Sequence, residues 1–170
     1  MIKSVLPNEN SKFFKQGYYT PRNPQKYIGD LNNIIYRSQM ELDFCRICDF
    51  SKKIVKWSSE PETPPFPIRY MHPISEEMKS YYPDYFVVVR QPNNIEERMI
   101  IEVKPESLTI PPKRPLPNAK KKTKDNYLNK LKVVAINLAK KRAAEIFCKQ
   151  YGMRYCFVTE KTIESIKGIF

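Results

Sequence analysis

One segment early in the chain places its apolar residues at the spacing of a helix with one buried face. The apolar positions of this stripe are Met40, Phe44, Ile47 and Phe50. A repeat of three to four residues returns to the same side of an α-helix at every turn. Ser38 precedes the stripe and Glu41 follows three residues later. This is the spacing of a capping box, so the pattern predicts a helix that begins near Ser38.

The central part of the chain alternates aromatic and β-branched runs with proline, which indicates strands and turns. Residues 54–57 predict a short strand, and residues 60–67, with four prolines, predict a loop or a sheet edge. Residues 81–89 are aromatic and β-branched and predict a strand that follows Pro83, while residues 91–94 have the composition of a turn. Residues 98–104 predict the returning strand. These two strands are expected to form an antiparallel hairpin.

The C-terminal half contains one long predicted helix over residues 125–151, with Gly152 as its natural stop. Its apolar stripe consists of Leu131, Val134, Ala135, Leu138, Ala143, Ile146 and Phe147. Residues 155–159 predict a final strand, and Thr159 can cap a last short helix that reaches about Lys167. The expected order is α-β-β-β-α-β, an α/β fold in which helices flank a small mixed sheet.

Length and proline content set the expected domain organisation. The chain has 170 residues, which suits one hydrophobic core. Residues 1–33 are polar and interrupted by prolines, each of which disfavours helical geometry in the residue before it, so an extended N-terminal arm is expected. Residues 34–170 are expected to form a single domain, in which the proline-rich residues 105–118 form an extended loop.

Charge is distributed unevenly along the chain. The formal net charge is +12, and residues 113–154 hold thirteen Lys and Arg side chains against two acidic ones. Residues 41–106 reverse the balance, with twelve acidic and nine basic side chains. A basic half beside an acidic centre is typical of a metalloenzyme that acts on a polyanion; the alternative is a solvated helix face beside a basic loop. The lysines predicted to contact DNA are Lys120, Lys121, Lys122, Lys124, Lys130 and Lys140.

Membrane, secretory and zinc-binding functions receive little support from the sequence. No run approaches the roughly 20 consecutive apolar residues of a membrane span, so no membrane partner is expected. The N-terminus lacks the apolar run of a signal peptide, so the cysteines are expected to stay reduced in a cytosol. Cys45 and Cys48 have the spacing of a zinc or redox pair, but no second pair completes a site, which favours buried thiols. His72, the single histidine, is expected in a loop rather than as a general base.

Acidic and basic side chains meet at one end of the predicted hairpin. Asp84 begins one strand, and Glu102 and Lys104 lie near the end of its partner. Because side chains alternate across a strand, Glu102 and Lys104 share a face, and hairpin pairing can bring Asp84 beside them. Two adjacent carboxylates favour Mg²⁺, with Mn²⁺ as an expected substitute, and such a cation polarises a phosphoryl oxygen and acidifies water. Lys104 would orient that water and stabilise developing negative charge.

Glu41 is the fourth candidate, because its helix can lean over the end of the hairpin and there complete the metal shell or hold a second ion. Each candidate also has a simpler explanation. Glu41 could act only in the capping box, Glu102 and Lys104 could be an exposed ion pair, and Asp84 could belong to a turn. The ordered combination of all four, followed by a basic helix, favours the site. A DNA-binding module without catalysis would explain the lysines but not the acids.

An ordered set of short motifs extends over nearly the whole chain. The motifs occupy residues 35–41, 55–60, 82–86 and 101–105, together with residues 18–30 and 157–160. The motif at residues 82–86 contains Pro83-Asp84, and the motif at residues 101–105 contains Glu102-x-Lys104. In this order the motifs resemble those of the head completion nucleases of large contractile-tailed bacteriophages, which belong to the PD-(D/E)XK superfamily.

The resemblance implies a restriction-endonuclease-like core, shared also with transposon-end nucleases. In that pattern Asp84 and Glu102 are metal ligands with the Val103 carbonyl as a third, Lys104 is the motif lysine, and Glu41 is the helix acid. It further implies an endonuclease that cleaves phosphodiester bonds of double-stranded DNA during head completion, after packaging. Head or portal proteins would be its partners, in the host cytoplasm and the assembled virion. The alternative is a structural head-completion protein at the portal that uses the fold only to bind DNA.

Overall fold

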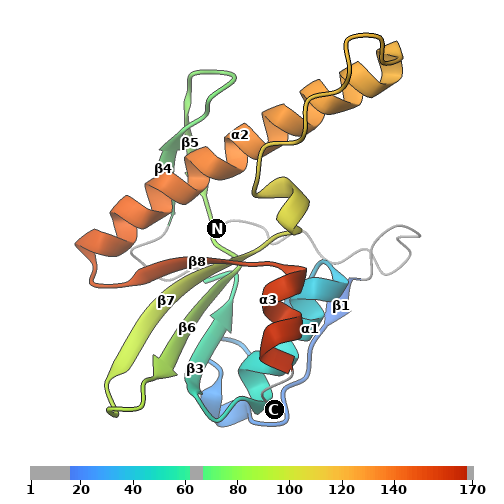
Figure 1. Ribbon diagram of the computed structural model, residues 1–170. Helices are drawn as coiled ribbons and strands as arrows, with labels where there is room; N and C mark the ends of the chain where they lie inside the picture. The colour runs from blue at the N-terminus through green and yellow to red at the C-terminus, as the bar shows by residue number, and fades with distance from the viewer. Residues whose placement is uncertain (1–15, 62–66, 168–170) are drawn as a thin grey trace.

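The computed structural model describes residues 16–61 and 67–167, and its centre is a four-stranded mixed sheet (Figure 1). The strands stand in the order β3 (Ile54–Ser59), β6 (Tyr85–Arg90), β7 (Glu96–Val103) and β8 (Arg154–Val158). β3, β6 and β7 pair antiparallel, whereas β8 runs parallel to β7. Parallel neighbours require a crossover connection, and here a long helix lies within it.

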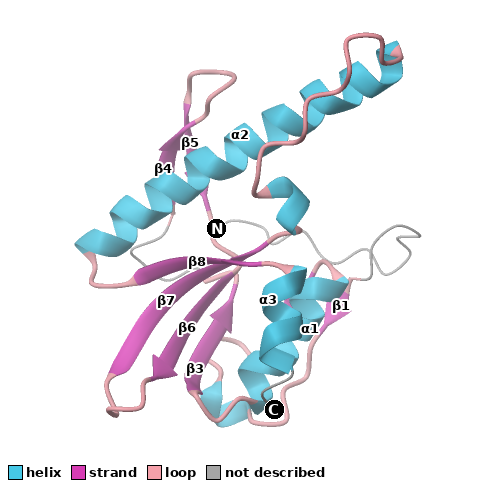
Figure 2. Cartoon of the chain, viewed as in Figure 1, coloured by secondary structure: helices cyan, strands magenta, loops and turns pink. Residues whose placement is uncertain are grey.

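Helices cover both faces of this sheet (Figure 2). α1 (Gln39–Phe50) and α3 (Glu160–Lys167) pack in the main core together with one face of the strands, including Cys156. Tyr155 is the neighbour of Cys156 in β8 and therefore points to the opposite face. There it packs in a second cluster with residues of α2 (Lys121–Gln150). None of the helices in the described ranges has the length and apolar character that crossing a membrane requires.

The segment before α1 runs along the body of the protein. It contains β1 (Gly17–Tyr18), the 3-10 helix η1 (Pro24–Lys26) and β2 (Ile35–Tyr36), which pairs antiparallel with β1. Asp49, buried near the end of α1, accepts hydrogen bonds from the Tyr19 hydroxyl at 2.8 Å and from two backbone N–H groups of this segment. These contacts tie the segment to α1. The first fifteen residues of the predicted arm lie outside the described residues.

A separate hairpin packs beside α2. It consists of β4 (Ile68–Met71) and β5 (Met78–Tyr81), which form a two-stranded sheet of their own. Its base is apolar, because Ile68, Tyr70 and Tyr81 are buried in one cluster with Ala144 of α2. The loop after β7 contains a second 3-10 helix, η2 (Glu106–Leu108), which the Asn137 side chain of α2 holds by a 2.9 Å hydrogen bond to its last carbonyl.

The predicted α/β class and the order α-β-β-β-α-β are confirmed by α1, β3, β6, β7, α2 and β8. The β4–β5 hairpin was not predicted, whereas the strand expected after Pro83 is confirmed by β6. Tyr81 ends β5 and Tyr85 begins β6, because Pro83 between them has no N–H group for a sheet ladder. α2 begins at Lys121, four residues earlier than expected.

Part of the predicted apolar stripe of α2 is exposed. Leu131, Leu138 and Ile146 are 37%, 38% and 57% exposed, whereas Ala144 is fully buried. For Leu131 the reason is visible in Figure 1, where the N-terminal half of α2 extends beyond the sheet, whereas Leu138 and Ile146 line an open groove between α2 and the β4–β5 hairpin. Phe50, at the last turn of α1, is likewise 58% exposed rather than buried as expected.

Candidate active site

Strand register brings the predicted acidic and basic residues to one end of the β6–β7 hairpin. Tyr85 pairs with Ile101, so Asp84, one residue before Tyr85, lies beside Glu102. Ile101 and Val103 point into the main core, and the alternation of the strand turns Glu102 to the other face. Strand pairing and alternation alone place these residues together, which explains why their meeting could be predicted from the sequence.

Three of the four predicted catalytic side chains are in direct contact. Lys104 Nζ lies 2.8 Å from Glu102 Oε1 and 3.6 Å from Asp84 Oδ2. Asp84 Oδ2 also accepts a 2.8 Å hydrogen bond from the Val103 N–H, so Val103 reaches Asp84 through its amide group. The backbone N–H of Lys104 donates to the Val158 carbonyl at 3.0 Å, which fixes the residue after β7 against β8. The end of β7 that carries Glu102 and Lys104 is therefore held by contacts with Asp84, next to β6, and with Val158 of β8.

Glu41 lies near this group, but its carboxylate is engaged in the capping box. Its Oε2 accepts the Arg37 backbone N–H at 2.7 Å, its Oε1 lies 3.1 Å from Ser38 Oγ, and its own N–H donates to Ser38 Oγ at 3.1 Å. The predicted start of the helix is thereby confirmed. Over residues 16–61 and 67–167, no three acidic, His or Cys side chains gather closely enough to hold a metal ion. Asp84 and Glu102 thus form a pair to which Glu41 does not add a third ligand in this arrangement.

The electrostatics of the pair favour a bound cation. Burial, followed by repulsion from Glu102, raises the pKa of Asp84 above its ordinary range, while Lys104 acts in the opposite direction. Burial disfavours the charge of Lys104, yet attraction to Asp84 and Glu102 raises its pKa above the ordinary value. An ammonium group thus already lies between two carboxylates whose oxygens converge on it. Such a set of hard oxygen donors also suits Mg²⁺.

Replacing Asp84 with asparagine is expected to stabilise the metal-free protein by about 1 kcal/mol or more at pH 8. A carboxyl whose pKa is raised in the folded state contributes stability that is fully present below its unfolded pKa, about 3.9, and is lost as the pH rises through the folded pKa. Asparagine carries no charge, so variant and wild type should differ little at pH 4 and increasingly above it. Urea unfolding in EDTA at pH 4, 6 and 8 measures this difference. A variant less stable than wild type at pH 8 would show that the attraction to Lys104 outweighs the cost of burial.

Glu102 has one further partner that the sequence did not reveal. The Tyr81 hydroxyl donates a 2.6 Å hydrogen bond to Glu102 Oε2, and both residues are buried. Tyr81 comes from β5, outside the four-stranded sheet, so no strand alternation or motif spacing could have placed it there. The Lys140 ammonium lies 5.2 Å from the centre of the Tyr81 ring and 5.9 Å from that of Tyr70.

The six lysines predicted to contact DNA are spread along α2. Lys120, Lys121, Lys122 and Lys124 are exposed at its N-terminus, and Lys130 is half-buried. Lys140 lies near the ring of Tyr81, the residue whose hydroxyl donates to Glu102. At about 1.5 Å per helical residue, the N-terminal cluster lies roughly 25–30 Å along the axis from Lys140. The six lysines therefore do not gather around the acidic pair but are distributed along the length of α2.

The remaining candidates from the sequence occupy structural positions. Cys45 and Cys48 are buried in the main core, as the preferred interpretation predicted, and burial raises the pKa of the Cys45 thiol to about 12. His72 lies in the loop between β4 and β5, where its Nδ1 accepts the Ser75 N–H at 3.1 Å. Its placement in a loop is therefore confirmed.

Comparison with known proteins gives two matches. Residues 51–160 match the family described as TnsA-like endonuclease N terminal, a range that includes Asp84, Glu102 and Lys104 and begins after Glu41. The chain is also similar to the protein named Head completion nuclease of Enterobacteria phage T4, with 27% identity over 152 residues, which cover 88% of this chain and 94% of that protein. These matches confirm the predicted resemblance and, with the mixed sheet and its helices, the restriction-endonuclease-like fold class.

Proposed function

Because this chain belongs to the family of TnsA-like endonuclease N-terminal domains, we propose that it is a Mg²⁺-dependent endonuclease that hydrolyses phosphodiester bonds of double-stranded DNA. The observation that carries this proposal is the convergence of Asp84, Glu102 and Lys104 at one end of the β6–β7 hairpin. Two carboxylates that share a single lysine can bind a cation for the hydrolysis of a polyanion. As a purely structural contact, the same arrangement contributes little stability.

Each residue of the group has a distinct proposed role. Asp84 and Glu102, with the Val103 carbonyl, would hold Mg²⁺, for which Mn²⁺ would substitute. When bound, the cation supplies polarisation of a phosphoryl oxygen and acidification of water. Lys104 orients the attacking water and stabilises negative charge as it develops on the phosphate. Glu41 is proposed as the helix acid at the border of the site, in addition to its part in the capping box.

The lysines of α2 provide the proposed contacts to the DNA backbone. Lys140 lies near the Tyr81 ring, and Lys130 and the cluster at Lys120–Lys124 continue along the helix. Neutralisation of phosphates by lysine gives affinity without sequence preference. This arrangement supports binding of a duplex along α2, with one phosphate brought to the acidic pair.

The biological setting proposed is the completion of DNA-filled phage heads, in the host cytoplasm and the assembled virion, with head or portal proteins as partners. Support comes from the name of the T4 relative, which the alignment covers almost completely. A structural head-completion protein is the alternative, and Asp84→Ala separates the two. In a phage that depends on this chain, loss of infectious particles with a folded Asp84→Ala protein supports catalysis, whereas normal yields would leave the structural alternative.

The direct test of the activity uses supercoiled plasmid. The purified protein should convert it to nicked or linear forms in the presence of Mg²⁺, and EDTA should stop the reaction. Intact plasmid after prolonged incubation with Mg²⁺ or Mn²⁺ and an excess of folded protein would overturn the proposal.

Calcium is expected to bind the acidic pair but to support little or no cleavage. Ca²⁺ takes more ligands at longer and less regular distances than Mg²⁺, so it positions the attacking water poorly. Calorimetric titration measures binding of Ca²⁺, and the plasmid assay in Ca²⁺ alone measures cleavage. Equal rates with Ca²⁺ and Mg²⁺ would require a different account of how water is activated.

A further inference from the structure

Tyr81 connects two parts of the fold that share no strand pairing. It is the last residue of β5, and its hydroxyl donates to Glu102 Oε2 at 2.6 Å, while Glu102 belongs to β7 of the central sheet. Both side chains are almost fully buried, with 2% and 3% of their residue surfaces exposed. A short hydrogen bond between a buried phenol and a buried carboxylate is a strong, directional contact.

The two oxygens of Glu102 are divided between two partners. Oε2 receives the Tyr81 hydroxyl, and Oε1 lies 2.8 Å from Lys104 Nζ, on the side of Asp84. The Tyr81 hydroxyl is the donor to Oε2, so Tyr81 fixes which oxygen faces away from Asp84. The other oxygen is then directed toward the point on which the acidic pair converges.

The chain between Tyr81 and Asp84 is short and stiff. Only Tyr82 and Pro83 separate them, and Pro83 is fully buried and fixes its own backbone torsion. Tyr81 and Asp84 therefore contact Glu102 and Lys104 from one rigid segment, which leads from the base of the β4–β5 hairpin into β6.

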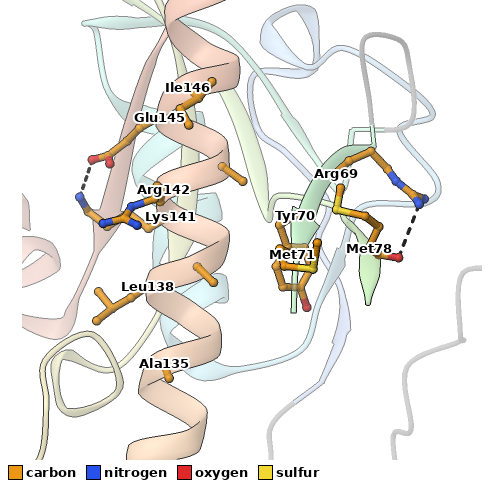
Figure 3. A pocket seen from close by; sticks show the side chains of 12 residues that line it. Arg69, Tyr70, Met71, Met78, Ala135, Leu138, Lys141, Arg142, Glu145 and Ile146 are labelled. Carbon is orange, nitrogen blue, oxygen red and sulfur yellow. Dashed lines mark hydrogen bonds and ion pairs between the residues drawn. The ribbon is translucent and has the colours of Figure 1, made fainter. Parts of the chain in front are cut away.

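The hairpin itself is anchored at its base. Ile68 and Tyr81 pack against Ala144 of α2, and the Lys140 ammonium lies near the Tyr70 and Tyr81 rings. Further out, a groove of about 720 Å³ lies between the hairpin and α2. Its lining includes Met71, Met78, Leu138 and Ile146, and Figure 3 shows the two methionines on the hairpin side and the other two residues on the helix side. The base contacts, and with them Tyr81, thus determine where the hairpin sits.

We propose that Tyr81 is a positioning residue of the metal site, which orients Glu102 for the cation and couples the seating of the β4–β5 hairpin on α2 to the affinity for that cation. This inference rests on the proposed function, because it concerns the same acidic pair. Its experimental signature is a change in cation affinity rather than in the chemical step. Partners that hold metal-ligating carboxylates commonly change metal affinity or activity about 10–100-fold when removed.

The test compares Tyr81→Phe with the matched control Tyr70→Phe. Both variants lose one hydroxyl from the same hairpin and keep a ring near Lys140, but only Tyr81 donates to Glu102. Calorimetric titration with Mn²⁺ should show affinity at least about 10-fold weaker for Tyr81→Phe and unchanged for Tyr70→Phe. In the plasmid assay, the Mg²⁺ concentration that gives half of the maximal rate should rise by a similar factor, and the rate at saturating Mg²⁺ should return close to that of wild type.

The outcomes separate this inference from the function on which it rests. Wild-type protein that binds no Mn²⁺ and cuts no DNA would remove the proposed function. Wild-type binding together with equal Mn²⁺ affinity in folded Tyr81→Phe would overturn the role of Tyr81 alone. Circular dichroism and thermal unfolding establish folding. If Tyr81→Phe does not fold, Tyr81→Met takes its place, since it keeps a long apolar side chain without a hydrogen-bond donor, and the same weakening is expected; unchanged affinity again overturns the proposal.

Discussion

Replacing Asp84, Glu102 or Lys104 with alanine is expected to abolish Mg²⁺-dependent DNA cleavage, with a loss on the order of 10³-fold or more for each, while the protein remains folded. Asp84→Ala and Glu102→Ala each remove half of the pair proposed to hold the cation. Lys104→Ala leaves the carboxylates but removes the ammonium that lies between them. Initial rates of plasmid nicking at saturating Mg²⁺ measure the effect, and circular dichroism reports folding.

Two further variants serve as a control and as a test of Glu41. Glu97 lies on the same strand, but its carboxylate pairs with Arg154 rather than with Lys104. The Glu97→Ala variant should therefore cut DNA at the wild-type rate. Glu41→Gln keeps a residue suited to the capping box but loses the charge, so a marked fall in rate would assign Glu41 to the metal site and an unchanged rate to the cap alone. Cleavage by Glu102→Ala at the rate of wild type would refute the assignment of the site.

Removal of the N-terminal lysine cluster of α2 is expected to flatten the salt dependence of DNA binding by up to roughly 3 to 4 units of log affinity per log salt. Lys120, Lys121, Lys122 and Lys124 are exposed, and the first turn of α2 contains no acidic residue. Positive charges at a helix N-terminus oppose the helix dipole, so phosphate relieves an unfavourable arrangement as it binds. Each lysine that neutralises a phosphate contributes a slope of about −0.9.

Fluorescence anisotropy with a labelled duplex across a salt series, in Ca²⁺, measures this slope for the variant with all four lysines changed to alanine. Lys52→Ala combined with Lys53→Ala is the control, because these lysines precede β3 at the end of the sheet opposite Asp84. Cleavage at low salt and saturating DNA should change far less than the slope. A slope equal to that of wild type would mean that the cluster faces solvent or a protein partner instead of DNA.

The acidic site could be predicted from the sequence because local rules suffice to build it. Asp84, Glu102 and Lys104 lie on two strands joined by a short turn, and strand alternation alone determines their common face. The capping box at Ser38 is equally local. Glu41 shows the limit of such rules, because the same spacing that predicts the cap cannot say whether its carboxylate is also free to bind a cation.

The contact between Tyr81 and Glu102 lay beyond sequence reasoning. Tyr81 precedes Pro83, after which the strand was expected, and nothing in the sequence indicated that Tyr81 ends a strand of its own. Its position depends on how the β4–β5 hairpin packs on α2, a tertiary arrangement between segments that are about 60 residues apart in the chain. Likewise, periodicity identified the apolar positions of α2 but not the groove that the β4–β5 hairpin leaves open beside it, so Leu138 and Ile146 were expected to be buried.

The parallel pairing of β7 with β8 also sets the order in which the site is completed during synthesis. The two acids and their lysine have all been made by residue 104, but β8, whose Val158 carbonyl holds the Lys104 backbone, follows only after the whole of α2. By residue 104, β3 and α1 are also made and can support β6 and β7, but pairing between segments distant in the chain forms slowly. A chain still emerging from the ribosome therefore carries its acids on a sheet that lacks β8 and α2, and the Lys104 backbone gains its contact with Val158 only when the last strand has closed the sheet. For a nuclease, this order of folding is expected to keep the nascent chain from cutting DNA before its synthesis is complete.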